Sequence, residues 1–100
     1  METVLVTGFN GFIGSHLIPK LIQKYNVVGL STSKNSQLKI SQIKTDITKI
    51  DKKILPSKIS KIIHLAAISD VDFCQKNPLD TSKINIIGTQ KILELARKND

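Results

Sequence analysis

The sequence predicts an α/β fold in which a parallel four-stranded sheet, with its strands in the order 3-2-1-4, carries helices on both faces. Two patterns indicate this fold. Short apolar runs, typical of strands covered on both faces, alternate with segments whose apolar residues recur at helical spacing. The connections between them are short, and right-handed crossovers starting from the first strand give the stated order.

The first part of the chain predicts a strand, a helix and a second strand. Val4–Val6 is a continuous apolar run and predicts the first strand. Apolar residues from Phe12 onward have helical spacing and predict a helix that ends near Lys24. Val27–Leu30 is the second apolar run, so these segments form a βαβ unit. The polar stretch Ser31–Gln37 predicts a turn directly after the second strand.

The middle of the chain has a weaker pattern. Ile40 and Ile43, with Ile47 as the outermost candidate, bracket a predicted third strand, with Asp46 at its end. Thr48–Leu55 is compatible with a short helix, for which Thr48 or Asp51 would be the N-cap.

The last part of the chain predicts a fourth strand and a long helix. Lys61–Ala67 is apolar and ends in two small residues, which would let a backbone or a ligand approach closely. From Pro78 to about Lys98, apolar residues at mostly helical spacing predict the final helix. The crevice between the first and fourth strands, where the strand order reverses, is the position at which open α/β sheets bind ligands.

Composition limits the class of protein. The chain has 100 residues, of which 40% are hydrophobic, and this supports one globular domain. Its formal net charge is +7, but the lysines are spread along the chain, which is typical of a solvated surface rather than a nucleic-acid site. The single cysteine, Cys74, excludes an internal disulfide framework, and the two histidines and one cysteine lack metal-ligand spacing. No secretory signal or membrane-spanning run is present, so we expect a cytoplasmic protein without a membrane partner.

The turn after the first strand carries Gly8, Gly11 and Gly14 and leads directly into a helix. Free main-chain amides and the positive end of the helix dipole then face whatever lies above the strand tip, and a phosphate group suits that position. The alternative is a tight turn with only a structural role.

Five motifs occur in an order that resembles a known family. They are TGFNGFIGSHL at Thr7–Leu17, TDI at Thr45–Ile47, HLAA at His64–Ala67, the proline at Pro78, and NIIGTQKILELAR at Asn85–Arg97. Together they resemble the first third of extended short-chain dehydrogenases, and the nearest group is the NAD-dependent epimerase/dehydratase family, which acts mainly on nucleotide-activated sugars. The resemblance implies a Rossmann-like three-layer αβα fold, with residues 1–100 as the N-terminal part of one NAD(P)-binding domain that is truncated after the fourth strand and its helix.

The resemblance also implies the parts of a cofactor site. The cofactor pyrophosphate would be held by Gly8, Gly11, Phe12, Ile13 and Gly14. Asp46 and Ile47 would hold the adenine, with the carboxylate accepting a hydrogen bond from the exocyclic amine. A wall beneath the cofactor would consist of Leu65, Ala66 and Ala67, supported by Asn85, and Ser69 would lie near positions that face the substrate or the nicotinamide side.

The sequence departs from the family pattern after the second strand. Members that prefer NAD carry an acidic residue there, which bonds the ribose 2′-hydroxyl, whereas this chain has the sequence Ser31, Thr32, Ser33, Lys34. Hydroxyl groups and an ammonium suit a 2′-phosphate better than a bare diol. We therefore expect NADP or NAD as cofactor, with NADP favoured.

A second departure concerns catalysis. The family uses a Tyr-x-x-x-Lys pair, but the only tyrosine, Tyr25, is followed four places later by Gly29. The sequence thus predicts no catalytic residue in this chain, and the pair and the substrate region would lie elsewhere. Two hypotheses stay open: the cofactor-binding portion of a nucleotide-sugar epimerase, dehydratase or reductase, or a free-standing dinucleotide-binding module or half-protein that needs a partner chain. In either case the sheet edge at the fourth strand predicts self-association or pairing with a complementing chain.

Several candidate residues have simpler interpretations. His64, inside an apolar strand, is expected to be a hydrogen-bonded core histidine rather than a ligand. Asp46 could be a simple cap or a solvated loop residue, and Asn85 could be a buried polar residue that ties the helix to the loop after the fourth strand. Asp70 and Asp72, with the nearby serine, are expected to form a polar loop over the cofactor.

Overall fold

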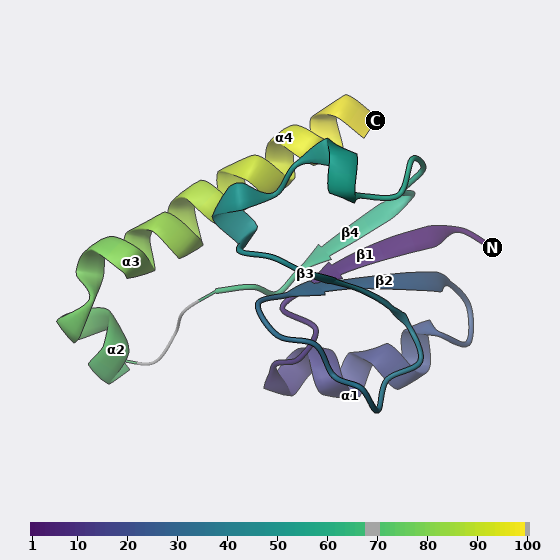
Figure 1. Cartoon of the computed structure of the whole chain (residues 1–100), viewed down its shortest axis with the longest axis horizontal. Coiled ribbons are helices and arrows are strands. Elements are labelled where there is room, and N and C mark those ends of the chain that lie inside the picture. The colour runs from purple at the N-terminus through teal and green to yellow at the C-terminus, as the bar shows by residue number, and fades with distance from the viewer. Residues whose placement is uncertain (68–70, 100) are drawn as a thin grey trace.

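A computed structural model describes residues 1–67 and 71–99 and contains one parallel sheet. Its strands are β1 (Thr3–Thr7), β2 (Asn26–Ser31), β3 (Ser41–Lys44) and β4 (Lys61–His64). They lie in the order β3-β2-β1-β4 (Figure 1). The predicted parallel sheet and its strand order are confirmed.

Helices cover both faces of this sheet (Figure 1). Helix α1 (Phe12–Leu21) lies on one face. The other face carries α4 (Thr89–Asn99) together with two short 3₁₀ turns, η1 (Ile47–Lys49) and η2 (Lys52–Ile54). The expected three-layer arrangement is therefore confirmed.

The hydrophobic core consists of two clusters, one on each face, because side chains alternate along the strands. In β1, Val4 and Val6 pack with Ile18 of α1, whereas Leu5 packs with Ile92 of α4. The side chains of Val4, Leu5 and Val6 are all fully buried, which explains why the first strand is a continuous apolar run rather than an alternating one.

Strand register aligns the carboxyl ends of the three strands next to the glycine turn. Thr7 of β1 pairs with Leu30 of β2 on one side and with His64 of β4 on the other. At the far side of β2, Ser31 pairs with Lys44 of β3. The residues that directly follow these positions therefore leave the sheet side by side, at the carboxyl ends of the strands.

Two elements end earlier than the sequence predicts. Helix α1 ends at Leu21, and the carbonyl of Leu21 then accepts the amides of Lys24 and Tyr25 in a turn. Strand β4 ends at His64 rather than Ala67, because β1 itself turns away at Gly8. The amide of Ala66 therefore donates to the side-chain Oγ1 of Thr7 instead of to a strand carbonyl.

The predicted short helix at Thr48–Leu55 is wrong, because this segment forms the two separate 3₁₀ turns. The N-cap of the first is Asp46 rather than Thr48, since Asp46 accepts the Thr48 amide. Asp51 accepts the amide of Lys53 at 3.0 Å and thereby satisfies the start of the second turn. A carboxylate at each start stabilises a short turn in place of one continuous helix.

The C-terminal part is helical but is not a single regular helix. Helix α3 (Pro78–Ser82) continues through a π-helical segment, η3 (Lys83–Gly88), into α4. Before it lies α2 (Val71–Lys76), which the sequence analysis missed, so Asp72 stands in the first turn of a helix rather than in a polar loop. Ser69 and Asp70 lie outside the described residues. Helices α2 and α3 extend beyond the carboxyl ends of the strands (Figure 1).

Within residues 1–67 and 71–99, no helix has the length and apolar character needed to cross a membrane.

Candidate functional site

Gly8 forms the turn at the end of β1 and lies directly against the main chain that follows β4. Its φ of +67° is in the left-handed region, which L side chains rarely adopt. A Cβ atom at Gly8 would lie 2.7 Å from the amide nitrogen of Ala66. The Gly8 amide donates to the carbonyl of Leu30 at 2.8 Å, so this turn is fixed to β2 as well. A glycine is therefore required here by the fold alone.

Gly14 and Gly11 differ in what surrounds them. A Cβ at Gly14 would lie 2.5 Å from the carbonyl oxygen of Phe9, a fully buried residue, so Gly14 lets α1 pack closely on the turn. A Cβ at Gly11 would meet only the carbonyl oxygen of Gly8, at an ordinary 3.4 Å, and the φ of Gly11 is −76°. The described protein atoms thus require glycine at positions 8 and 14 but not at position 11.

The amino end of α1 faces away from the core at its first residues. Gly11 is the N-cap, and no side chain caps the helix. The side chains of Phe12 and Ile13 are 82% and 64% exposed. Main-chain amides in the first turn have no partner within a helix, and the helix dipole places positive potential there. The ten-residue helix thus offers amide donors to an anion at this point.

A cavity of about 280 Å³ opens at the carboxyl ends of the strands, beside the glycine turn. Six of the predicted site residues line it, namely Gly8, Ser31, Thr32, Ile47, Ala66 and Ala67. Three further lining residues were not predicted as site residues, namely Leu30, Thr45 and Ile84. Leu30 and Thr45 were recognisable as the last residue of a strand and the first of the TDI motif, whereas no sequence signal marks Ile84.

The remaining predicted residues do not line this cavity. The helix-start residues Gly11, Phe12, Ile13 and Gly14 belong to the amino end of α1. Ser33 and Lys34 are exposed in the loop after β2. Leu65 packs against the cluster on the α1 face, and Asn85 lies half-buried in η3.

Asn10 is a residue of the glycine turn that the sequence analysis did not single out. Its Nδ2 donates to the carbonyl of Ser33 at 2.9 Å and lies 3.2 Å from Ser33 Oγ. At the other end of the same loop, the side-chain amide of Gln42 bonds both the amide and the carbonyl of Asn35, at 2.8 and 2.7 Å. The loop after β2 is therefore held to the glycine turn at one end and to β3 at the other.

Asp46 combines a structural bond with a free acceptor. Its Oδ1 accepts the amide of Thr48 at 2.9 Å and the hydroxyl of Thr48 at 2.8 Å, so the interpretation as a cap is confirmed. These bonds to Thr48 hold the pKa of the Asp46 carboxyl below its usual value. Because both bonds involve Oδ1, Oδ2 is left to accept from a ligand.

His64 is a hydrogen-bonded core histidine, as predicted. Its Nδ1 lies 2.6 Å from Thr7 Oγ1 and its Nε2 lies 3.0 Å from Thr89 Oγ1. Partial burial lowers its pKa, because desolvation penalises the charged imidazolium. Thr89 Oγ1 in turn donates to the main-chain carbonyl of Asn85 at 2.7 Å, so Thr89 is the side chain that links the helical run to β4, and a tie made by the Asn85 side chain stays a prediction.

Other candidate chemistry is weaker. Cys74 is half-buried in α2. In the described part of the chain, no three His, Cys, Asp or Glu side chains are grouped so that they could hold a metal ion. Larger hollows of about 400 and 440 Å³ lie beside α4 and beside the amino ends of β2 and β3, and neither is lined by a residue of the glycine turn. The smaller cavity, in contrast, is lined by Gly8 of the glycine turn.

Comparison with known proteins agrees with this geometry. The model of the "NAD dependent epimerase/dehydratase family" matches residues 4–100. A putative UDP-glucose 4-epimerase of Methanocaldococcus jannaschii is 38% identical over 97% of this chain. UDP-glucuronic acid decarboxylase 6 of Arabidopsis thaliana is 36% identical over 95% of this chain.

Solved structures share the fold at similar levels of identity. A UDP-N-acetylglucosamine 4-epimerase from Methanobrevibacter ruminantium superposes with a TM-score of 0.85 and 30% identity, over 98% of this chain and 34% of that one. MoeE5 in complex with UDP-glucose and NAD gives a TM-score of 0.84 and 30% identity, over 97% of this chain and 33% of that one. The chain likewise covers only 34% and 30% of the lengths of the two relatives above, so it corresponds to about their first third.

Proposed function

Because this chain belongs to the NAD dependent epimerase/dehydratase family, we propose that its cavity and glycine turn bind the dinucleotide of an enzyme that acts on a nucleotide-activated sugar. One observation carries the proposal. The required glycine at position 8, the uncapped amino end of α1 and the small residues Ala66 and Ala67 meet at one edge of the sheet. This edge is the carboxyl edge, where open α/β sheets bind ligands.

The pyrophosphate would lie over the amino end of α1. Main-chain amides at Phe12 and Ile13 would donate to its oxygens, since these side chains point away from the core. Gly11 would face the phosphate directly. The described protein atoms leave room for a Cβ at Gly11, so the close approach of a ligand would explain why glycine occurs there.

The adenosine would occupy the cavity between β2 and the segment after β3. Ile47 is buried and lines the cavity, and would pack against the adenine ring. Asp46 Oδ2 would accept a hydrogen bond from the exocyclic amine, while Oδ1 keeps its bonds to Thr48. The capping bonds thus orient the carboxylate before a ligand arrives.

The opposite wall would carry the rest of the cofactor. Ala66 and Ala67 line the cavity, Leu65 anchors them to the core, and the main-chain carbonyl of Asn85 is linked to the same wall through Thr89 and His64. Small side chains leave room for a flat ring to approach the main chain.

The loop after β2 favours NADP in this proposal. Ser31 and Thr32 line the cavity, Lys34 is exposed in the same loop, and residues 31–40 contain no acidic side chain. Lys44 adds a second ammonium, because it stands opposite Ser31 in the sheet register. A 2′-phosphate would gain from these cations, whereas a bare ribose would lack the acid that usually binds its diol.

When bound, the nicotinamide would accept or donate a hydride at a sugar carbon. This chain's residues would bind and orient the cofactor for that step. The sequence contains no Tyr-x-x-x-Lys pair, so in this proposal the proton transfers and the sugar contacts belong to a part of the enzyme outside residues 1–100.

A free-standing dinucleotide-binding module or a half-protein that needs a partner chain is the second candidate. It is favoured by the same lack of a catalytic pair.

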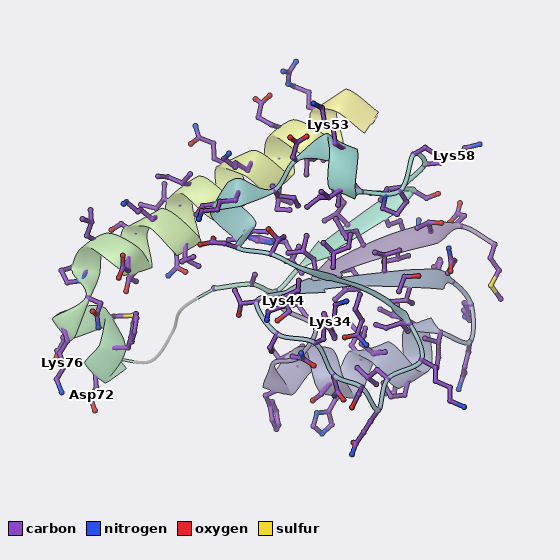
Figure 2. The ribbon with its side chains drawn as sticks, viewed as in Figure 1. Lys34, Lys44, Lys53, Lys58, Asp72 and Lys76 are labelled. Atoms are coloured by element: carbon purple, nitrogen blue, oxygen red, sulfur yellow. The ribbon has the colours of Figure 1, made fainter. Side chains whose placement is uncertain are left out.

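The surface of the chain supports a protein partner rather than a nucleic acid. Strand β4 is an edge of the four-stranded sheet, and we expect it to pair with a second copy or a complementing chain. Figure 2 shows the labelled side chains of Lys53, Lys58 and Lys76 on different parts of the molecule rather than in one patch.

Calorimetric titration of NAD and NADP into the wild-type chain and the Gly11→Ala variant tests the proposed site. We expect binding to the wild type, and a loss of at least tenfold in affinity for Gly11→Ala at unchanged melting temperature, because only the ligand would meet the new methyl group. Ser57→Ala, an exposed position before β4, is the control and should bind like the wild type. Absence of binding to the wild type, or unchanged affinity in Gly11→Ala, would contradict the proposal.

Cofactor choice is tested in the same assay. Lys34→Ala and Lys44→Ala should each weaken NADP binding about three- to tenfold and leave NAD binding unchanged. Lys58→Ala is the charge-matched control, since Lys58 extends from the loop before β4 (Figure 2). Tighter binding of NAD than of NADP by the wild type would refute the NADP preference and leave the dinucleotide site intact.

A further inference from the structure

A chain of hydrogen bonds crosses the sheet edge beneath the candidate cofactor site. It starts at the amides of Leu65 and Ala66, which donate to Thr7 Oγ1 at 3.1 and 3.2 Å. It continues from Thr7 through the two nitrogens of His64 to Thr89 Oγ1. It ends at the carbonyl of Asn85, which accepts the Thr89 hydroxyl at 2.7 Å.

The direction of each bond follows from the number of protons available. The Thr89 hydroxyl has one proton, and that proton goes to the Asn85 carbonyl, which can only accept. Thr89 Oγ1 must therefore accept from His64, so Nε2 carries the imidazole proton. A neutral imidazole has only one N–H group, and Nδ1 is then the acceptor for the Thr7 hydroxyl.

This direction leaves the lone pairs of Thr7 Oγ1 for main-chain amides. With its proton directed to Nδ1, Oγ1 accepts from Leu65 and Ala66 together. The amide of Leu65 also donates to the main-chain carbonyl of Thr7 at 3.0 Å, whereas the amide of Ala66 donates to Thr7 Oγ1. The position of Ala66 thus depends on the orientation of one hydroxyl group.

The π-helical segment supplies the other end of the chain. The amide of Thr89 donates to the carbonyl of Ile86, three residues earlier, rather than to that of Asn85. The carbonyl of Asn85 instead accepts the Thr89 hydroxyl, which turns Thr89 Oγ1 into a fixed acceptor for His64. Irregular turns of this kind frequently mark functional positions in helices.

We infer that His64 is a positioning residue for the dinucleotide site. As the neutral Nε2–H tautomer, it directs the Thr7 hydroxyl so that the main chain at Leu65 and Ala66 is held against Gly8, where Ala66 lines the cavity. The effect on cofactor affinity rests on the proposed function. The effect on the Ala66 main chain does not.

Two substitutions at His64 test its two hydrogen bonds separately, because asparagine and glutamine differ in side-chain length. In His64→Asn, the amide oxygen replaces Nδ1 as acceptor for Thr7 and the link to Thr89 is lost. In His64→Gln, the side-chain amide reaches the position of Nε2, so the link to Thr89 is kept and the acceptor for Thr7 is lost. His64→Leu removes both.

Amide hydrogen exchange at Ala66, measured without cofactor, tests the positioning role. We expect exchange close to the wild-type rate in His64→Asn and about tenfold faster exchange in His64→Gln and His64→Leu, which is the effect of one lost hydrogen bond. Exchange at Val28, in the buried core of β2, serves as the control for global stability. A merely structural histidine would instead raise exchange at Ala66 and Val28 alike in all three variants, and that result would overturn the inference.

The tautomer and the affinity are measured separately. Side-chain ¹⁵N spectra of the wild type should show His64 with protonated Nε2 and unprotonated Nδ1 at neutral pH, and the opposite tautomer would overturn the inference. NAD affinity should fall about fivefold or more in His64→Gln and His64→Leu and less than twofold in His64→Asn. If the wild type does not bind NAD or NADP, the proposed function fails, and the Ala66 exchange pattern still decides the role of His64.

Discussion

Substitution of the turn glycines by alanine should separate what the fold requires from what a ligand requires. In Gly8→Ala, two costs add together. The φ of +67° costs an L residue roughly 1–2 kcal/mol. The new Cβ would lie 2.7 Å from the Ala66 amide nitrogen, and relief of that overlap by main-chain movement costs about 1–3 kcal/mol.

The expected loss of unfolding free energy for Gly8→Ala is therefore about 2–5 kcal/mol. Gly14→Ala lacks the unfavourable φ but would place its Cβ 2.5 Å from the Phe9 carbonyl oxygen, so we expect about 1–3 kcal/mol. Gly11→Ala should change stability by less than about 1 kcal/mol, because its φ of −76° suits alanine and its nearest neighbour lies at 3.4 Å.

Urea denaturation followed by circular dichroism measures all three variants. The midpoint should fall for Gly8→Ala and Gly14→Ala and stay near that of the wild type for Gly11→Ala, with equal slopes. Gly11→Ala as the most destabilised of the three would refute the reasoning, since the geometry of the turn would then not be the one described. Equal midpoints for Gly8→Ala and Gly11→Ala would refute it as well.

Further predictions concern a cap, a histidine, a packed glycine and the sheet edge. Asp46→Ala should lower the unfolding free energy by about 1 kcal/mol through loss of the η1 cap, measured by urea denaturation, and Thr48→Ala should remove only part of that effect. The pKa of His64 is lower in the folded than in the unfolded chain, so its contribution to stability is complete above about pH 6.5 and is lost as pH falls below that value. Thermal melts from pH 7.5 to 5 should show this slope in the wild type and a smaller one in His64→Asn. Gly88→Ala should destabilise by about 1–3 kcal/mol, because its Cβ would lie 2.5 Å from Ile47 Cγ2, and an unchanged melting temperature would contradict that contact. Sedimentation velocity should show concentration-dependent association through the β4 edge, and a monomer at all concentrations would count against it.

The elements with strong local signals were predicted correctly. The runs Val4–Val6 and Val27–Leu30 are strands because they are covered by helices on both faces, and such burial leaves a continuous apolar pattern in the sequence. The strand order followed from crossover handedness alone. The cytoplasmic location and the NADP preference stay predictions.

The errors occur where short segments compete for the same main-chain groups. Thr48–Leu55 became two 3₁₀ turns because two carboxylates cap it at different positions. Helix α2 has only six residues, which is too short for a repeating apolar pattern in the sequence. The apolar residues of the π-helical segment η3 have the spacing of a regular helix, so the sequence does not distinguish the two. Of the candidate site, the cavity wall at Ile84 was missed for the same reason.

The sequence by itself determined the glycine turn, the strand order and the start of a helix directly after that turn, because each depends on local geometry and chain handedness. Only the tertiary structure decided which glycine the fold needs and which it does not, since that depends on how closely Ala66 and Phe9 approach the turn. It also decided that Thr7, His64 and Thr89, which lie far apart in the sequence, share one hydrogen-bonded chain. Contacts of this kind are fixed by packing between elements, and no local pattern encodes them.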